Sequence, residues 1–286
     1  MFQTTINTSA SLQGVGVHTG NEFSVTLRPA EVDTGIIFVR KDQPTEINTI
    51  IADFRNVSNT NMCTTLSNKH GIEVRTVEHL MAALYIMNVN NVIVEVSGGE
   101  IPILDGSSAS WIKTISQAGI RQQASNVEII KILRPIKIED GARWASLIPF
   151  DRFFVTVECD FSEKGLKSEP ISYDSNKDDF IRDFTLARTF GFMSDVEFLK
   201  KHNMARGASL ENTVVFDDHG KKINEEPLRY ENEPARHKLL DAVGDLALSG
   251  FRIQGKYESY CPGHQLNNLI LKKLFESKEN YELITA

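Results

Sequence analysis

The chain has 286 residues, of which 41% are hydrophobic and 24% charged, a composition typical of a globular protein with two ordinary domains or one large one. Its net charge of −7 argues against nucleic acid as the main partner, because nucleic-acid binders usually carry a basic surface. There is no signal-peptide pattern, the apolar runs are far shorter than the roughly 20 residues of a membrane span, and the three cysteines are widely spaced. We therefore expect a cytoplasmic protein without stable membrane insertion.

Apolar periodicity predicts both strands and helices in the first half of the chain. We expect strands at 23–28, 35–40 and 91–96, and helices at about 75–88 and 107–118. The second half continues the mixed pattern, and Pro234 suits the first turn of one of its helices. There we expect strands near 127–138, 143–149, 153–159, 213–216 and 251–257, and helices near 176–188, 194–201, 234–249 and 264–276.

The two halves share an order and a spacing. Gly106 follows His79 after 27 residues, and His264 follows His237 after 27 residues. Between these positions each half has the order helix, turn, strand, turn, helix. Few residues are identical, so the pattern rather than identity indicates a divergent internal duplication.

A duplication predicts two domains that share one site. We place them at 1–124 and 127–286, with the boundary in the polar segment 121–126, which lacks periodicity. A pseudo-symmetric pair of domains could bring His79 and His237 to one interface, and clefts between domains are common ligand sites.

The helix predicted at 234–249 carries a polar stripe. His237 and Asp241 stand four residues apart, so they lie on one face with Cβ atoms roughly 5–6 Å apart and could bind one metal ion. Lys238 and Asp245 lie beside them. The alternative is a solvated helix face, because charged pairs at this spacing often decorate surfaces.

Glu78 and His79 offer a third ligand with a base beside it. The adjacent Glu78 could reach a metal-activated water without being a ligand itself. The alternative is an exposed helix start at which the helix dipole stabilises the glutamate. Two histidines and one carboxylate, with room for water, form a catalytic zinc arrangement, although such O/N sites also suit iron(II).

His264 follows the turn Pro262-Gly263 and stands at a predicted helix start. It could be a general acid, with Asp245 orienting it or raising its pKa by Coulomb attraction. The alternative is a surface or capping histidine. We assign no role to His18, which lies in a loop-like context.

Several motifs, taken together, resemble those of the LpxC family, the zinc-dependent UDP-3-O-acyl-N-acetylglucosamine deacetylases of lipid A synthesis. The resemblance runs in order along nearly the whole chain. It rests on Gly14-Val15-Gly16-Val17-His18-Thr19-Gly20, Val77-Glu78-His79-Leu80, Ile103-Leu104-Asp105-Gly106-Ser107-Ser108, Ala187-Arg188-Thr189-Phe190-Gly191-Phe192, the stretch 236–245 and Gly263-His264-Gln265-Leu266-Asn267-Asn268.

The resemblance implies a role for each residue of the catalytic site. It implies that one zinc ion is held by His79, His237 and Asp241. It further implies Glu78 as general base, His264 as general acid supported by Asp245, Thr189 as donor to the oxyanion, and Lys238 as a substrate contact. Amide hydrolysis needs these functions, namely an activated water, a stabilised oxyanion and a proton for the nitrogen.

The resemblance also implies a substrate, UDP-3-O-acyl-N-acetylglucosamine. Arg143 and Phe161 fall at the positions for the uridine diphosphate, and arginine in place of the family's frequent lysine still binds phosphate. The acyl chain would occupy an apolar passage lined by Phe190, Phe192, Val196 and the segment 205–216, with Met62 and Cys63 near the site. The alternative is that the apolar residues of this lining are ordinary core residues.

The fold that the resemblance implies is α+β, with two similar two-layer α/β domains from an internal duplication and helices sandwiched between the sheets. Each domain carries an insert, which in the second is a β-α-β element at about 193–222. No coiled-coil pattern is present, and we expect a monomer. Two other functions stay open. One is a zinc amidase or esterase acting on another small substrate, and the other is a non-catalytic, metal-stabilised binding protein.

Overall fold

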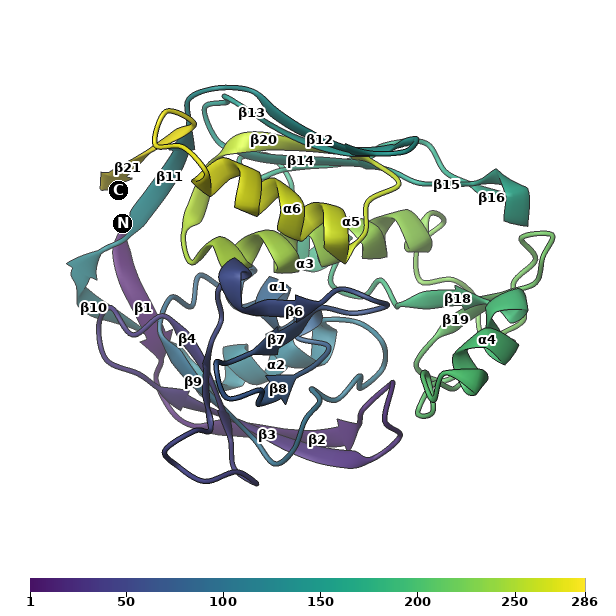
Figure 1. Ribbon diagram of the computed structural model, residues 1–286, viewed down its shortest axis with the longest axis horizontal. Helices are drawn as coiled ribbons and strands as arrows, with labels where there is room; N and C mark the ends of the chain where they lie inside the picture. Colours follow the sequence, from purple (N-terminus) through teal and green to yellow (C-terminus); the bar gives the residue numbers. More distant parts are fainter. Residues whose placement is uncertain (286) are drawn as a thin grey trace.

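The protein is described here by a computed structural model that covers residues 1–285. Two large sheets enclose a layer of helices, as Figure 1 shows. The fold is therefore α+β, as the sequence predicts, with the helices sandwiched between the sheets. None of the helices in residues 1–285 is long and apolar enough to cross a membrane.

The sheet of the first half has five strands in the order β2-β3-β9-β4-β5. Alternation of polar and apolar residues makes one of its faces apolar, and in β3 the side chains of Val25 and Leu27 are fully buried. The strands are β2 (Ala10–Val15), β3 (Glu22–Pro29), β4 (Ile36–Arg40), β5 (Thr49–Ile51) and β9 (Val92–Val96).

The sheet of the second half has seven strands and is organised by β20 (Arg252–Tyr260), which pairs with three others. It is antiparallel to β13 and parallel to β11 and β14, and alternate side chains along it are buried. The remaining strands are β11 (Glu128–Ile132), β12 (Ile136–Asp140), β13 (Arg143–Ile148), β14 (Phe153–Glu158), β17 (Ile171–Asp174) and β21 (Tyr281–Thr285).

Short strands form four smaller sheets. One of them is a three-stranded sheet inserted in the first half, and another is a parallel pair that encloses a helix and forms the β-α-β insert expected in the second half. They are β1 (Phe2–Ile6) with β10 (Ile120–Asn126), β6 (Val57–Asn59), β7 (Thr65–Ser67) and β8 (Glu73–Val74) together, β15 (Asp160–Phe161) with β16 (Leu166–Lys167), and β18 (Phe190–Phe192) with β19 (Val214–Phe216).

The helices are mostly short, and the two that carry the predicted metal ligands pack against each other. The α-helices are α1 (Glu78–Ile86), α2 (Ala109–Ala118), α3 (Phe180–Asp183), α4 (Val196–Lys201), α5 (Glu233–Leu246) and α6 (His264–Phe275). Single 3₁₀ turns are η1 (Phe54–Asn56), η2 (Ser162–Lys164), η3 (Met193–Asp195) and η4 (Ala247–Ser249).

Gly244 sets how closely α1 and α5 approach. A Cβ atom at this position would lie 2.0 Å from the backbone oxygen of Glu78, so only glycine fits. The contact joins the first turn of α1 to the last turns of α5. It brings Glu78 and His79 against the polar stripe of α5, although the two segments are far apart in the sequence.

Two sequence expectations are wrong in detail. The segment 127–138 forms two strands rather than one, because the chain breaks before Pro135, which cannot donate a ladder hydrogen bond. The helix expected at 176–188 is limited to α3, which is followed by a turn at 184–186 and by three residues without regular structure before β18. The segment 121–126, in which we expect the domain boundary, forms most of β10, which pairs with β1.

The helix–strand–helix order expected in each half is present, as α1-β9-α2 and as α5-β20-α6. That this order reflects a duplication, and that the domains are 1–124 and 127–286, stay predictions.

Candidate active site

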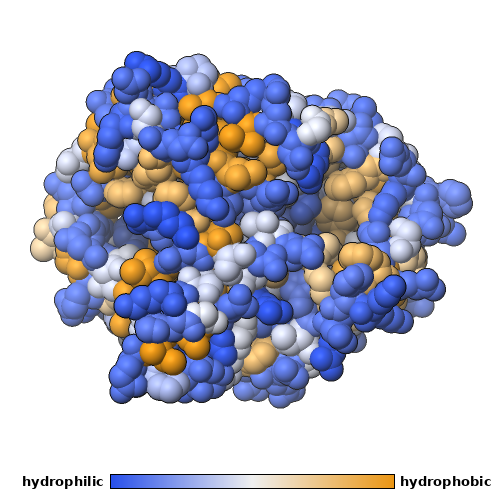
Figure 2. Space-filling view, viewed as in Figure 1, coloured by the Kyte–Doolittle hydropathy of each residue, from blue (hydrophilic) through white to orange (hydrophobic). Residues whose placement is uncertain are grey.

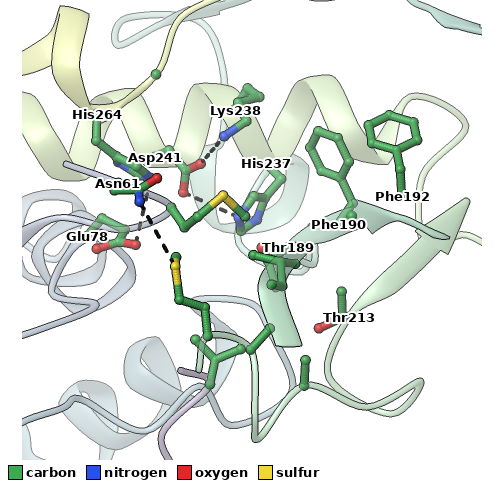
Figure 3. A pocket seen from close by; sticks show the side chains of 18 of the residues that line it. Asn61, Glu78, Thr189, Phe190, Phe192, Thr213, His237, Lys238, Asp241 and His264 are labelled. Atoms are coloured by element: carbon green, nitrogen blue, oxygen red, sulfur yellow. Dashed lines mark hydrogen bonds and ion pairs between the residues drawn. The ribbon is translucent and has the colours of Figure 1, made fainter. Parts of the chain in front are cut away.

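A cavity of about 1120 Å³ lies where α1, α5 and the start of α6 meet the β18–β19 insert. Its floor is polar, and the side chains of Glu78, His237, Asp241 and His264 point into it in Figure 3. We call the buried residues at this floor the polar cluster, namely Glu78, His79, His237, Asp241, Asp245 and His264.

Three ligand atoms of the polar cluster converge on one point. Nε2 of His79 lies 3.2 Å from Nε2 of His237 and 3.5 Å from Oδ1 of Asp241, and the third distance, from His237 to Asp241, is 3.3 Å. A tetrahedral zinc ion with bonds of about 2.0–2.2 Å separates its ligand atoms by roughly 3.3–3.6 Å. The triangle has the size that such an ion requires.

The hydrogen bonds around these atoms leave their lone pairs free. Nδ1 of His237 lies 3.0 Å from the backbone oxygen of Ala187, so Nδ1 carries the proton and Nε2 presents a lone pair. Lys238 donates a hydrogen bond of 3.0 Å to Oδ2 of Asp241, and Oδ1 has no hydrogen-bond partner within residues 1–285. A buried lone oxygen facing two imidazole nitrogens is explained by a cation between them.

The pKa values fit the same role. Burial lowers the pKa of His237 to about 4, against the attraction of Asp241, so the imidazole is neutral at neutral pH. Burial alone would raise the pKa of Asp241, but its interactions with His237 and with the charged Lys238 hold it well below its usual value. Neutral imidazole and ionised carboxylate are the forms that bind a metal.

Glu78 and His264 face each other beside the ligand triangle. Oε1 of Glu78 lies 3.9 Å from Nε2 of His264. Burial raises the pKa of Glu78, with His264 and His79 opposing it. Burial lowers the pKa of His264, but Asp245 and Glu78 overcome that effect and raise the value to about 9. The pair therefore consists of a carboxylate of increased basicity and an imidazolium.

Asp245 holds His264 as the sequence suggests. Its Oδ2 lies 2.8 Å from Nδ1 of His264 and accepts a hydrogen bond of 2.8 Å from Asn267. Asn267 in turn accepts one of 2.5 Å from the hydroxyl of Tyr257. The imidazole is therefore fixed from the α5 side, with Nε2 aimed at the cavity.

The surface alternatives for these residues are wrong. Only 2% of His237 and 4% of Asp241 is exposed, so their face of α5 is not solvated. Glu78 and His264 are buried as well, so neither a solvent-exposed helix start nor a surface histidine describes them.

Apolar side chains form the side of the cavity away from the polar cluster. In Figure 3 the rings of Phe190 and Phe192 stand beyond Thr189, and Figure 2 shows apolar side chains around a hollow on the side where Figure 1 places β18 and β19. We call this set the apolar wall. It comprises Phe190, Phe192, Met193, Val196, Leu199, Met204, Leu210 and Val215.

Strand alternation explains how the insert serves both core and cavity. In β19, Val214 and Phe216 are buried in a small cluster with Phe192, whereas Val215, between them, lines the cavity. Phe192 belongs to that cluster and also lines the cavity. Phe192 is therefore part of a small core and of the cavity lining, and its contact with an acyl chain stays a prediction.

Of the remaining predicted site residues, all but Cys63 line the cavity. Thr189, Lys238, Arg143, Phe161 and Met62 line the cavity. The ring of Phe161 contacts those of Phe190 and Phe192, with centroids 5.7 and 5.6 Å away.

Cys63 is not among the lining residues. Its thiol is buried, its Sγ lies 3.8 Å from the hydroxyl of Thr65, and burial raises its pKa to about 12. The neighbouring Met62, which has a φ of 66°, is half exposed and lines the cavity, whereas Cys63 is buried. The position of Cys63 therefore does not support a direct contact with substrate.

No role is expected for His18 from the sequence, but it lines the cavity with a buried Nδ1 that has no partner among the described residues. Burial lowers the pKa of His18, with Glu100 opposing it, so the imidazole is neutral. The signal that could have identified it is its place within the Gly14–Gly20 motif.

Comparisons with known proteins agree with the geometry. The family model described as LpxC, UDP-3-O-acyl N-acetylglycosamine deacetylase, matches residues 3–276. Proteins named UDP-3-O-acyl-N-acetylglucosamine deacetylase from Shewanella sp. (strain ANA-3), Shewanella oneidensis and Shewanella loihica are each 40% identical over 287 aligned residues. Each alignment covers 100% of this chain and 93% of the relative.

Proposed function

The chain belongs to the LpxC family of UDP-3-O-acyl-N-acetylglucosamine deacetylases, and from this membership we propose its reaction. It hydrolyses the N-acetyl amide of a UDP-3-O-acyl-N-acetylglucosamine in lipid A biosynthesis, releasing acetate and the free amine. The observation that carries the proposal is the polar cluster, which combines three convergent ligand atoms with a base and an acid on one cavity floor.

We propose zinc as the cofactor, held by His79, His237 and Asp241, because the ligand triangle and the donor set fit it. Zinc supplies Lewis acidity, which polarises an amide carbonyl and makes a water molecule more acidic. Three protein ligands leave a coordination position open, as catalytic zinc sites do, whereas structural sites usually have four. Iron(II) suits the same donors, so metal analysis of the purified protein distinguishes the two.

Glu78 is proposed as the general base. Its carboxylate stands beside the ligand triangle and lines the cavity, so it can accept a proton from the attacking water. Its raised pKa makes it a stronger base than an exposed glutamate. Adjacent residues on a helix point about 100° apart, which lets His79 bind metal while Glu78 stays free for the proton.

His264 is proposed as the general acid. A pKa of about 9 keeps its imidazole protonated at neutral pH, so Nε2 has a proton for the leaving amine nitrogen. The positive charge also stabilises the oxyanion that develops on the carbonyl. Thr189, which lines the cavity directly before β18, is proposed to donate a hydrogen bond to that oxyanion, and Lys238 to contact the substrate beside the base.

The lining of the cavity suits the two parts of the proposed substrate. Arg143 and Phe161 both line the cavity and offer a guanidinium for phosphate and a ring face for a base. The apolar wall offers a surface for the acyl chain, which a simple amidase of small substrates would not need.

We further propose that the enzyme acts as a cytoplasmic monomer. A single chain supplies the whole polar cluster, and the three cysteines are free thiols, which persist in a reducing compartment.

The decisive experiment measures acetate release from UDP-3-O-acyl-N-acetylglucosamine by the wild type and Glu78→Gln. We expect the wild type to be active and Glu78→Gln to lose about 100-fold or more in kcat while its bound metal is retained. Glu46→Gln, at an exposed position, serves as the control. Full activity in Glu78→Gln would overturn Glu78 as the base. A wild type that releases no acetate and unfolds on metal removal would overturn the enzymatic proposal and indicate a metal-stabilised binding protein.

A further inference from the structure

Thr64 lies between Glu78, the proposed base, and Asp245, which holds the proposed acid His264. It immediately precedes β7 in the small inserted sheet, and only 1% of it is exposed. The structure gives all three of its polar groups a partner. Its backbone oxygen accepts a hydrogen bond of 3.4 Å from the backbone N–H of Val77, directly before α1.

The backbone N–H of Thr64 donates to Glu78. The distance from this nitrogen to Oε2 is 3.1 Å, and it is the one hydrogen bond to the Glu78 carboxylate within residues 1–285. With Oε2 held in this way, Oε1 is the oxygen that faces His264. The Thr64 backbone thus selects which carboxylate oxygen of Glu78 is directed toward the acid.

The hydroxyl of Thr64 donates to Asp245. The two oxygens, Oγ1 and Oδ1, are 2.5 Å apart, a short charge-assisted hydrogen bond. Since Oδ2 of Asp245 faces His264 and Asn267, the Thr64 hydroxyl occupies the other oxygen. A donor to Oδ1 withdraws charge from the carboxylate, so it weakens the pull of Asp245 on the proton of His264.

We propose that Thr64 is a positioning residue for the deacetylation, which holds Glu78 and Asp245 in one frame and tunes the strength of His264 as an acid. The inference rests on the proposed function. It adds a residue that touches neither the metal ligands nor the substrate cavity but connects the two proton-transfer groups.

The test compares Thr64→Val, which removes only the hydroxyl, with Thr64→Ser, which restores a hydroxyl. Thr65→Val is the matched control, because Thr65 is the next residue, is equally buried and contacts Cys63 rather than the polar cluster. The measurements are kcat and KM for the UDP substrate across pH, bound metal, and the imidazole NMR signals of His264.

For Thr64→Val we expect about a 10-fold fall in kcat with KM and bound metal near the wild-type values. We also expect the alkaline limb of the kcat profile to move up by roughly half a pH unit, because Asp245 then holds the His264 proton more strongly. The other ionisable groups facing His264 are Glu78, Asp241 and His18, and none of them changes. Thr64→Ser should return the limb and most of kcat toward the wild type.

Distinct outcomes overturn distinct claims. If Thr64→Val shows the same kcat, alkaline limb and NMR signals as Thr65→Val, Thr64 has only a structural role and the inference is wrong. If the wild type itself releases no acetate, the proposed function fails instead. Thr64→Ala removes the same hydroxyl with less bulk and carries the same test should Thr64→Val not fold.

Discussion

The polar cluster and the apolar wall line one cavity, but they are built in different ways. The polar cluster comes from α1, α5 and α6, and its members are buried and fixed by hydrogen bonds to one another and to neighbouring residues. Much of the apolar wall comes from a short insert, in which Met193 and Leu210 are half exposed. The proposed catalytic residues are thus held by helices packed between two sheets, and the proposed acyl-binding surface is formed mainly by a small insert.

The difference teaches which changes each region tolerates. A change in the polar cluster leaves a buried polar atom without its partner, which costs about 1–3 kcal/mol and more for a charge. A change at the apolar wall mainly alters the shape of the cavity and its apolar area. Each Å² of apolar surface that is no longer buried costs roughly 25 cal/mol. We therefore expect variants of the first kind to affect kcat or folding, and variants of the second kind to affect which acyl chain is accepted.

The largest effect is expected at the buried ion pair that joins the two regions. Arg188, between Ala187 and Thr189, is paired with Glu233 at 2.8 Å, and both side chains are almost fully buried. Glu233→Gln leaves the guanidinium without its charge partner and should lower the free energy of unfolding by about 3–5 kcal/mol, measured by denaturant titration. Glu226→Gln removes the exposed partner of the same arginine and should change it by less than about 1 kcal/mol. Equal effects of the two variants would contradict this account of the pair.

Asp245→Asn tests the polar cluster alone. The acid form of His264 exists below its pKa of about 9, so wild-type activity should fall as the pH rises through that value. Without the Asp245 charge the pKa of His264 falls, so the alkaline limb should move to lower pH and kcat should drop about 100-fold. An alkaline limb that stays in place would rule out His264 as the titrating acid. Asp151→Asn, at an exposed site, is the control.

Val215→Trp tests the apolar wall. Since Val215 points into the cavity from β19 while its neighbours are buried on the other face, the larger ring should fill the passage without disturbing the insert. We expect kcat/KM to fall about 10-fold for a long acyl chain and little for a short one. A loss independent of chain length would show that the wall does not bind the acyl group.

The smallest effect is expected at Arg143. Its ion pair with Asp140 is on the surface, so Arg143→Ala should leave stability nearly unchanged. If Arg143 binds phosphate, the KM for the UDP substrate should rise by about 3- to 10-fold with kcat near the wild-type value, and Arg143→Lys should retain more affinity. An unchanged KM would remove Arg143 from the nucleotide site.

The parts of the fold that the sequence predicts are those with local causes. The alternation in β3 and the apolar periodicity of α5 and α6 each follow from residues close in sequence. The split between β11 and β12 also has a local cause, because Pro135 interrupts an otherwise continuous apolar run. The chain beyond α3 is held by a distant contact, because Arg188 pairs with Glu233, 45 residues further along the sequence, and no local pattern specifies this pairing.

The same distinction applies to the site. His237 and Asp241 were found because helix periodicity places them together, and the repeated spacing then indicated His79. Neither helix periodicity nor a repeated spacing identifies Thr64 or His18. The contact of Thr64 with Asp245 spans 181 residues and depends on how α1 packs against Gly244 of α5, which no local pattern specifies.

The central claim is that His79, His237 and Asp241 hold a catalytic zinc ion, and metal analysis combined with a deacetylation assay of wild type and Asp241→Ala tests it most directly. We predict near-stoichiometric zinc and acetate release in the wild type, and loss of both in Asp241→Ala, with activity down by a factor of about 1,000 or more. Unchanged metal content in a folded Asp241→Ala protein would contradict the ligand assignment.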